Sequence, residues 1–415
     1  MKHALIIGSG LQGLNAAYAL KQRGVPEITI IDGASGPHGA SMVHAGWIVP
    51  AHSEPVGAPG MTRQSLKWML KSDSPLYIKP AVHDFEFMSW LFKFWRACNE
   101  KSYSHAIAAM VALNEKTFQL FDSYAENGVK FEMYKEGLIM AFLSGRNLEH
   151  GLEHAKRFEQ FGFDTPKVYW GAEARDFEPA LSDSVNGIFH IEHQRHLRSE
   201  SFTEGLLAWL RDHGITFASN TSVTGFDIAG GSVRAVETTN GRYEADSVVI
   251  AAGAYSGRIA SLAGKKLPVQ AGKGYKLDFH QPPTKLTHPL SLHEPRMAVT
   301  PMGPYTRFAG TMELSGINTK VRQERVRALM RGGQQFLRDW PTEIPSHTIG
   351  SGLRPMTPDG MPIIGTLPNV RNLTISTGHQ MLGLVLGPAS ADALAELITT
   401  GKTPAVLEPF SPNRF

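Results

Sequence analysis

Apolar and polar positions at the start of this chain follow the order strand, turn, helix, strand. The apolar run of residues 4–7 predicts a buried strand, and the segment 14–24 predicts a helix with cations in its last turn. A second apolar run, residues 28–31, predicts another strand, which ends at Asp32. Between the first strand and the helix stands a glycine-rich turn, Gly8-Ser9-Gly10-Leu11-Gln12-Gly13. This order is typical of the βαβ unit that binds a dinucleotide.

Each glycine of this turn has a physical role in such a unit. Gly8 permits the tight turn, Gly10 lets the backbone approach a diphosphate, and Gly13 allows the helix to pack closely on the strand. The diphosphate accepts hydrogen bonds from free N–H groups at the positive end of the helix dipole. Asp32, about twenty residues further on, is placed to accept hydrogen bonds from ribose hydroxyls and to repel a 2′-phosphate. The turn therefore predicts an adenine dinucleotide without that phosphate and leaves FAD and NAD open.

The rest of the chain mixes helical and strand patterns. Helical periodicity marks residues 62–72, 84–127 (two or more helices), about fifteen residues from Asn147, 201–213, 319–338 and the stretch that Gly387-Pro388 opens and Gly401 ends. Strand patterns mark residues 129–134, 138–142, 216–218, 232–239, 242–244, 247–256 (a buried strand ending in a glycine turn), 274–279, 297–301, 307–311 and 373–377. Two hairpins are predicted, at Glu136-Gly137 and at Asn240-Gly241. Residues 352–365 hold so many turn formers that they predict no regular element.

Composition describes an ordinary globular protein. With 415 residues, 42% hydrophobic and 19% charged, the chain is long enough for two domains. The net charge of +3 and the absence of a basic run predict no nucleic-acid partner. The single cysteine, Cys98, excludes an intrachain disulfide and a cysteine-based metal site, and we predict no metal.

Targeting signals are not evident in the sequence. The N-terminal apolar run is too short for a signal peptide, and no apolar stretch approaches the roughly twenty residues of a membrane span. Residues 85–95 are unusually aromatic, which predicts either a helix packed between domains or a face that docks on a membrane. We expect a cytoplasmic protein, with the inner face of the cytoplasmic membrane as the alternative.

Five segments together resemble the D-amino-acid oxidase-like flavoproteins, most closely the bacterial D-amino-acid dehydrogenase branch. They are the 8–13 turn with Asp32, the loop from Gly36-Pro37 to Ala45-Gly46, the strand end Ala251-Ala252-Gly253-Ala254, the segment Gly352-Leu353-Arg354-Pro355 and the loop 378–383. The resemblance covers nearly the whole chain and implies that the cofactor is FAD. It implies that FAD is held by Gly8, Gly10, Leu11, Gln12, Gly13, Asp32, Gly33, Ala40, Ser41, His44, Ala45, Gly46, Ala252, Gly253, Gly378, His379, Gln380, Met381, Leu382 and Gly383.

Dinucleotide-type patterns occur early, in the middle and late in the chain, which predicts two interleaved domains. The fold class is α/β with an α+β substrate half: a Rossmann-like FAD-binding domain and a domain with a mainly antiparallel sheet over the flavin. We place the FAD-binding domain at residues 1–85, 145–267 and 345–415 and the substrate-binding domain at residues 86–144 and 268–344.

The sequence departs from the family pattern in two places. Ala40-Ser41 and His44-Ala45-Gly46 replace the usual Thr-Ser and Asn-Ala-Gly, and residues 193–199 replace the usual aspartate and proline. Both regions border flavin or substrate in relatives. His44 has three interpretations: a hydrogen bond to the flavin, a structural role, or covalent attachment of the flavin, for which some relatives use histidine.

In this superfamily the arginine of the Gly-Leu-Arg-Pro segment, here Arg354, clamps the substrate carboxylate. A guanidinium stays charged and meets a carboxylate through two parallel hydrogen bonds. Tyr275 and Arg307 are candidates for a second contact to that carboxylate. The alternative for Arg354 is a structural ion pair with an acid such as Asp359.

The resemblance implies FAD-dependent oxidative deamination of a D-amino acid or a related small α-amino acid, with electrons passed to a quinone or another carrier. The first alternative is an oxidase or dehydrogenase of glycine, sarcosine or cyclic secondary amines such as D-proline or hydroxyproline, with oxygen as an acceptor. A different class, a flavin-binding sensor or interaction subunit without turnover, is the second alternative. The sequence alone does not separate quinone from oxygen.

Overall fold

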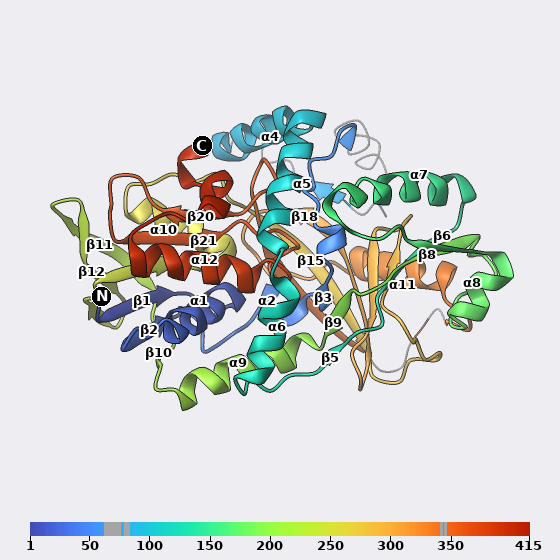
Figure 1. The fold of residues 1–415 in the computed structure, drawn as a ribbon, viewed down its shortest axis with the longest axis horizontal. Coiled ribbons are helices and arrows are strands. Elements are labelled where there is room, and N and C mark those ends of the chain that lie inside the picture. The colour runs from blue at the N-terminus through green and yellow to red at the C-terminus, as the bar shows by residue number, and fades with distance from the viewer. Residues whose placement is uncertain (62–75, 79–83, 341–342, 344–346) are drawn as a thin grey trace.

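The computed structural model describes residues 1–61, 76–78, 84–340, 343 and 347–415 and contains two main sheets (Figure 1). The predicted helix at residues 62–72 lies outside the described residues. The first sheet has six strands, with β1 and β2 side by side and β14 on the other side of β1. In sheet order the strands are β10 (Thr216–Ala218), β2 (Glu27–Ile31), β1 (His3–Ile7), β14 (Ser247–Ile250), β21 (Leu373–Thr377) and β20 (Ile363–Thr366). All neighbours run parallel except β20 and β21.

Alternate residues of β1 enter two separate cores, as the period of two in a strand requires. Ala4 and Ile6 pack with one face of helices, whereas Leu5 and Ile7 pack with the opposite layer. The helices of the first face are α1 (Leu11–Gln22), α9 (Ser199–Asp212), α12 (Gly387–Thr400), α5 (Glu100–Asn114) and α6 (Thr117–Glu126). The opposite layer contains α10 (Ser256–Leu262) and the small sheet of β11 (Val223–Ala229), β12 (Ser232–Thr238) and β13 (Gly241–Tyr243). The unit is therefore a three-layer dinucleotide-binding fold.

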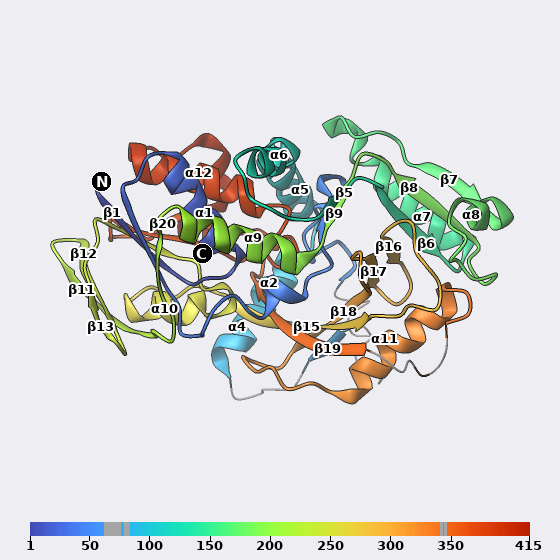
Figure 2. The ribbon, with the colours of Figure 1, turned by 90° about the horizontal axis from the view of Figure 1, so that it is seen from below.

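The second sheet is large and mostly antiparallel, and one of its edge strands leads along the chain into the first sheet. Its main path is β19 (His347–Met356), β15 (Gln270–Phe279), β18 (Thr306–Leu314), β17 (Met297–Pro301), β16 (Leu290–Leu292), β6 (Leu138–Phe142), β8 (Gly187–Ile191) and β7 (Lys167–Trp170). A ninth strand, β4 (Leu76–Ile78), pairs with β18. Helix α11 (Gln323–Phe336) packs on one face of this sheet (Figure 2).

The remaining elements connect or cover the two halves. A short sheet joins β3 (Trp47–Ile48), β9 (Arg195–Leu197) and β5 (Met133–Tyr134), and α4 (Phe85–Ala97) lies near the C-terminus (Figure 1). The other short helices are α2 (Ala40–Val43), α7 (Gly145–Lys156) and α8 (Gly171–Phe177), with 3-10 turns at η1 (Pro50–His52), η2 (Glu159–Phe161), η3 (Gly253–Tyr255), η4 (Ala405–Phe410) and η5 (Pro412–Arg414).

Two predicted elements are wrong. Residues 129–134 and 138–142 do not form a hairpin, because β5 pairs with β9 whereas β6 pairs with β8 and β16. Residues 352–365 are not irregular, because β19 runs through Met356 and β20 begins at Ile363. Pro355 is tolerated in β19 because that strand is at the sheet edge. The hairpin at Asn240-Gly241 is confirmed by the pairing of β12 with β13.

Sheet membership differs from the predicted domain boundaries. The range 145–267, assigned to the FAD-binding domain, contains β7 and β8, which pair within the large sheet. The range 86–144, assigned to the substrate-binding domain, contains α5 and α6, which pack into the core with α1 and α12. These elements belong to the other half than predicted, because the chain crosses between the two halves more often than the sequence patterns indicate. Two interleaved domains, with these elements exchanged, remain our proposal.

Candidate active site

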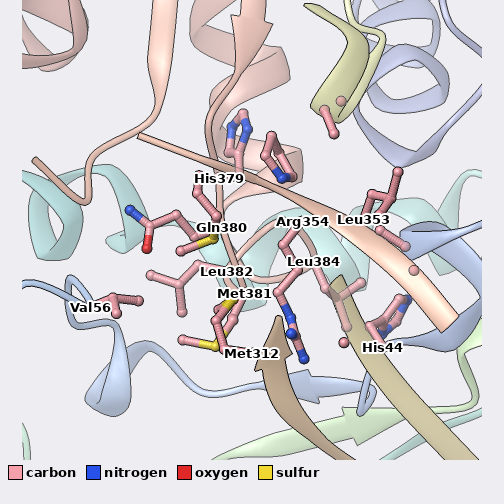
Figure 3. A pocket seen from close by; sticks show the side chains of 18 of the residues that line it. His44, Val56, Met312, Leu353, Arg354, His379, Gln380, Met381, Leu382 and Leu384 are labelled. Carbon is pink, nitrogen blue, oxygen red and sulfur yellow. The ribbon is translucent and has the colours of Figure 1, made fainter. Parts of the chain in front are cut away.

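One cavity of about 1500 Å³ runs from the glycine-rich turn to the face of the large sheet. This volume exceeds the roughly 300–1,000 Å³ of an ordinary small-ligand site. Its lining includes the first turn and Asp32 on the side of the six-stranded sheet, and Tyr275 and Arg354 on the large sheet. Figure 3 shows the part of the cavity around Arg354. The cavity therefore has room for an extended cofactor together with a substrate.

The glycine-rich turn has the geometry that a dinucleotide requires. Gly8 has φ of +114°, and a Cβ there would lie 2.6 Å from the Ala251 carbonyl oxygen. A Cβ on Gly13 would lie 1.8 Å from the Gly8 carbonyl oxygen, so only glycine fits. The turn thus lies tightly against β1 and β14 and leaves the N-terminus of α1 facing the cavity, where a diphosphate is stabilised.

Asp32 lies at the end of β2 and lines this part of the cavity. Its carboxylate accepts hydrogen bonds from the Ser9 backbone N–H at 2.6 Å, the Ser9 hydroxyl at 2.8 Å and the Ala34 backbone N–H at 2.8 Å. Asp32 therefore fixes the glycine-rich turn in addition to the predicted contact with ribose.

Most of the predicted cofactor-binding residues meet at this cavity although they come from five separate segments. Gly13 and Gly378 do not line it and act through the backbone geometry. The lining members are Gly8, Gly10, Leu11, Gln12, Asp32, Gly33, Ala40, Ser41, His44, Ala45, Gly46, Ala252, Gly253, His379, Gln380, Met381, Leu382 and Gly383.

The loop before α12 is held against the first helix. The Gln12 side-chain amide donates to the Gly383 carbonyl at 2.7 Å, and Gln380 has a left-handed backbone, φ +51°. The His379 ring lies 3.0 Å from the Ser390 hydroxyl, and burial lowers the pKa of His379 to about 3, so the ring is neutral. The loop thus lines the cavity up to Val385, just before the N-terminus of α12, which carries positive potential.

His44 is fixed within its loop. Its Nδ1 accepts a hydrogen bond from the Gly46 N–H at 3.0 Å and lies 3.1 Å from the Ser199 hydroxyl. Burial, and then the charge of Arg307, lowers the pKa of His44 to about 3, so the ring is neutral. These contacts fix the ring through Nδ1, while Nε2 has no partner among the described residues, so a hydrogen bond to the flavin and covalent attachment both stay predictions.

Arg354 extends from the edge strand β19 across β15. Its guanidinium donates to the Thr311 carbonyl on β18 at 2.8 Å, and it passes over Gly274, where a Cβ would lie 2.3 Å from guanidinium atoms. In Figure 3 the side chain points into the cavity between Met312 and His44. Burial lowers the pKa of Arg354 to about 10, which leaves the guanidinium protonated at neutral pH.

No ion pair within the described part of the chain includes Arg354. The alternative partner, Asp359, is paired with Arg414 at 2.6 Å, so the predicted alternative of an Arg354–Asp359 pair is wrong. A buried guanidinium without an acid is costly in a protein interior. A carboxylate brought in by a ligand would supply the missing charge.

The two predicted secondary contacts are differently placed. Tyr275 lines the cavity, but its hydroxyl donates to Glu313 at 2.6 Å, and burial followed by that hydrogen bond raises its pKa. Arg307 is fully buried outside the cavity lining and bonds to Asp278 through Nε at 2.7 Å, to Glu200, and to the His44 carbonyl at 3.0 Å. Arg307 therefore positions the loop around His44 and does not reach a substrate.

A polar end of the cavity was missed in the sequence because its members come from three distant segments. The Tyr103 hydroxyl donates to Glu54 at 2.7 Å, and Nδ1 atoms of His52 and His154 each lie 3.4 Å from Glu54. Burial raises the pKa of Glu54. The hydrogen bond and the charge of His52, the charge of His154 and the hydrogen bond from Tyr103 lower it more strongly, and the pKa falls to about 2. The group is therefore ionised. No group of three or more potential metal ligands occurs among the residues that the structure describes.

Comparisons with known proteins agree with this geometry. The family described as "FAD dependent oxidoreductase" (DAO) matches residues 3–397. A Granulibacter bethesdensis protein named D-amino acid dehydrogenase is 32% identical over 97% of this chain and 96% of that protein. A Neisseria meningitidis protein of the same name is 30% identical over 99% of both chains.

Solved structures share the fold at lower identity. Glycine oxidase from Geobacillus kaustophilus aligns with a TM-score of 0.77 and 20% identity over 100% of both chains. L-proline dehydrogenase from P. horikoshii aligns with a TM-score of 0.75 and 19% identity, covering 100% of this chain and 97% of that one.

The carboxylate of Asp32 leads to the first prediction. Asp32→Ala should weaken FAD binding by about 1–3 kcal/mol, because buried donors of the turn and the ribose lose their acceptor. The loss of affinity is measured as the FAD that the variant retains at equilibrium, by gel filtration and by flavin fluorescence. Retention equal to that of the unmodified protein would contradict a role for Asp32 in holding the cofactor.

The close approach of the Arg354 guanidinium to Gly274 leads to the second prediction. Gly274→Ala should displace the Arg354 guanidinium and lower kcat/KM for an amino acid by about tenfold or more, since a misplaced clamp loses its orientation. FAD retention and the Tm should change little because the displaced atoms end a flexible side chain. Gly225→Ala is the matched control, since its nearest neighbour would lie 3.8 Å away. An unchanged kcat/KM in Gly274→Ala would contradict the assignment of Arg354.

Proposed function

The chain belongs to the DAO family of FAD-dependent oxidoreductases, and from that premise we propose that it oxidises a D-amino acid to the imino acid. Water then converts the imino acid to a 2-oxo acid and ammonia. The observation that carries the proposal is the Arg354 guanidinium, which faces the cavity without an acid from the described residues. Relatives at 30–32% identity that are named D-amino acid dehydrogenase support the class of substrate and its configuration.

The residues present fit FAD, and when bound it accepts the hydride that leaves the substrate Cα. The amine loses one proton and the Cα loses a hydride, so two electrons leave and a C=N bond forms. Little acid–base work is needed from the protein, which supplies orientation and electrostatics. Arg354 holds the substrate carboxylate through its rigid fork, and this fixes the direction of the Cα–H.

Loop 42–44 is held by Arg307, a buried arginine that lies outside the cavity lining. Arg307 bonds to the Met42 and His44 carbonyls at 3.2 and 3.0 Å, while Asp278 and Glu200 neutralise its charge. Burial lowers the pKa of Arg307, but the bond and charge of Asp278, with Glu200, outweigh burial and raise it. The loop between the two halves is thus rigid at the point where the cofactor lies against it.

The electron acceptor that we propose is a membrane quinone. Large apolar side chains that are both exposed and part of the cavity lining form what we call the apolar rim: Trp95 (56% exposed), Met381 (52%), Leu262 (46%) and Tyr255 (43%). Helix α4 continues this surface with Phe85, Met88 and Phe92, and a Glu86–Lys266 ion pair at 3.8 Å joins α4 to the end of α10. No helix within the described ranges is long and apolar enough to cross a membrane. The rim therefore favours peripheral contact with a bilayer.

The carboxylate clamp is tested by a third prediction. Arg354→Ala should lower kcat/KM for an amino acid by about a hundredfold or more, because a charge-assisted bidentate contact is lost. Arg354→Lys should also be impaired, since it keeps the charge but loses the fork. Turnover of the amino acid and of its decarboxylated amine is compared at equal FAD content. A variant that keeps the original preference for the amino acid over the amine would rule out Arg354 as the clamp.

The acceptor is tested by a fourth prediction. Phe85→Ser with Phe92→Ser should reduce binding to lipid vesicles and slow reoxidation by quinone in those vesicles, since exposed apolar area is lost. Anaerobic flavin reduction by the amino acid should be unchanged, because neither residue lines the cavity. Ile228→Ser, which removes an exposed apolar residue from β11, is the control. Stoichiometric peroxide, with turnover in air as fast as with quinone, would contradict the proposed acceptor.

A further inference from the structure

Two backbone outliers lie opposite each other in the large sheet, at the floor of the cavity. Arg296 has φ of +52° and Thr311 has φ of +61°, a region that side chains other than glycine rarely adopt. Met297 pairs with Gly310, and the antiparallel register places Arg296 across from Thr311. The pairing of β15 with β18 is also irregular between Lys273 and Tyr275, where β18 passes from Glu313 to Gly310. Strain and bulges of this kind concentrate at functional sites.

Each outlier is linked to an arginine that lines the cavity. The Arg354 guanidinium donates to the Thr311 carbonyl, and the backbone of Arg296, just before β17, lies across from Thr311 at about 4.8 Å by ordinary strand spacing. Arg296 lines the same cavity. No ion pair among the described residues includes Arg296, so its guanidinium, like that of Arg354, faces the cavity without an acid in contact.

Acids near Arg296 are engaged elsewhere. Glu54 is bonded to Tyr103 and flanked by His52 and His154, and Glu294 accepts from the Leu143 N–H at 3.2 Å and the Asn147 amide at 2.9 Å. Burial lowers the pKa of Arg296, and the charges of Glu54 and Glu294 oppose that effect at a distance. Arg296 therefore keeps its hydrogen-bond donors available to a ligand.

From this juxtaposition we propose that Arg296 binds a second carboxylate, on the side chain of the substrate, so that the preferred substrate is an acidic α-amino acid. The α-carboxylate lies on Arg354 and the side-chain carboxylate on Arg296, with the Cα between them. A guanidinium on each end recognises a dicarboxylate more selectively than one alone. Which substrate carboxylate lies on which arginine is assigned on the basis of the proposed oxidation of an amino acid.

Matched pairs of acid and amide test the proposal with the holoenzyme. Anaerobic flavin reduction is followed with D-glutamate against D-glutamine and D-aspartate against D-asparagine, which differ in charge and hardly in shape. We expect the unmodified enzyme to prefer the acids by about tenfold or more, as a charge-assisted contact implies. Arg296→Gln should remove that preference and leave reduction by the amides within about twofold, because amides make no ionic contact. Glu54→Gln should increase the preference, since it removes an opposing charge.

A binding measurement separates this proposal from the proposed function. Glutarate and butyrate lack the amine and cannot be oxidised, and their affinities are read from the flavin absorption spectrum. Arg296→Gln should weaken the binding of glutarate and leave the affinity for butyrate unchanged. FAD retention and the Tm serve as controls for folding. Equal losses for both ligands, or no preference for acids in the unmodified enzyme, would overturn the role of Arg296. An enzyme whose flavin is reduced by no amino acid, yet which binds glutarate through Arg296, would instead overturn the proposed oxidation.

Discussion

A charge taken out of water must be compensated, and this constraint shapes the interface between the two halves of the molecule. The buried Lys273 lies 3.0 Å from Glu313, and the buried Arg307 lies between Asp278 and Glu200. These pairs lie behind the cavity and hold its walls. Arg354 contrasts with them, because its half-buried guanidinium lines the cavity with a backbone carbonyl as its partner and no acid among the residues that the structure describes. The compensation that the protein provides elsewhere is left here to the ligand.

The chemical groups that line the cavity also differ from one part of it to the next. Toward α1 and α12 the lining offers backbone N–H groups and helix termini, which suit a diphosphate and a flavin. Toward the large sheet it offers guanidinium groups, which suit carboxylates. At the apolar rim it offers aromatic and aliphatic side chains, which suit a hydrophobic acceptor. In the function that we propose, one cavity serves cofactor, substrate and acceptor without a separate domain for each.

The part of the site formed by the N-terminal βαβ unit could be predicted from the spacing of nearby residues. The turn at Gly8–Gly13 and Asp32 lie within one βαβ unit, so spacing alone identified them, and the structure brings these residues to the cavity. Arg307 was misplaced because its residue type fits a clamp, whereas its partners Asp278 and Glu200 are visible only once β15 and α9 are packed together. Glu54 and Arg296 gave no signal, since their neighbours come from α5, α7 and β18. Strand β19 was missed because its proline and two glycines resemble a loop, although an edge strand accommodates them.

The order of strands in the six-stranded sheet has a consequence for how the protein is made. Ile7 pairs with Ile31 inside the first unit, but its other neighbour is Ile250, which pairs in turn with Ile375, so β1 gains its second neighbour only after more than half of the chain has been synthesised. Contacts between such distant positions form slowly, and a nascent chain exposes apolar strand faces until they do. The cavity also takes residues 379–383 from near the end of the chain, so the cofactor site is complete only once nearly all of the chain has been made.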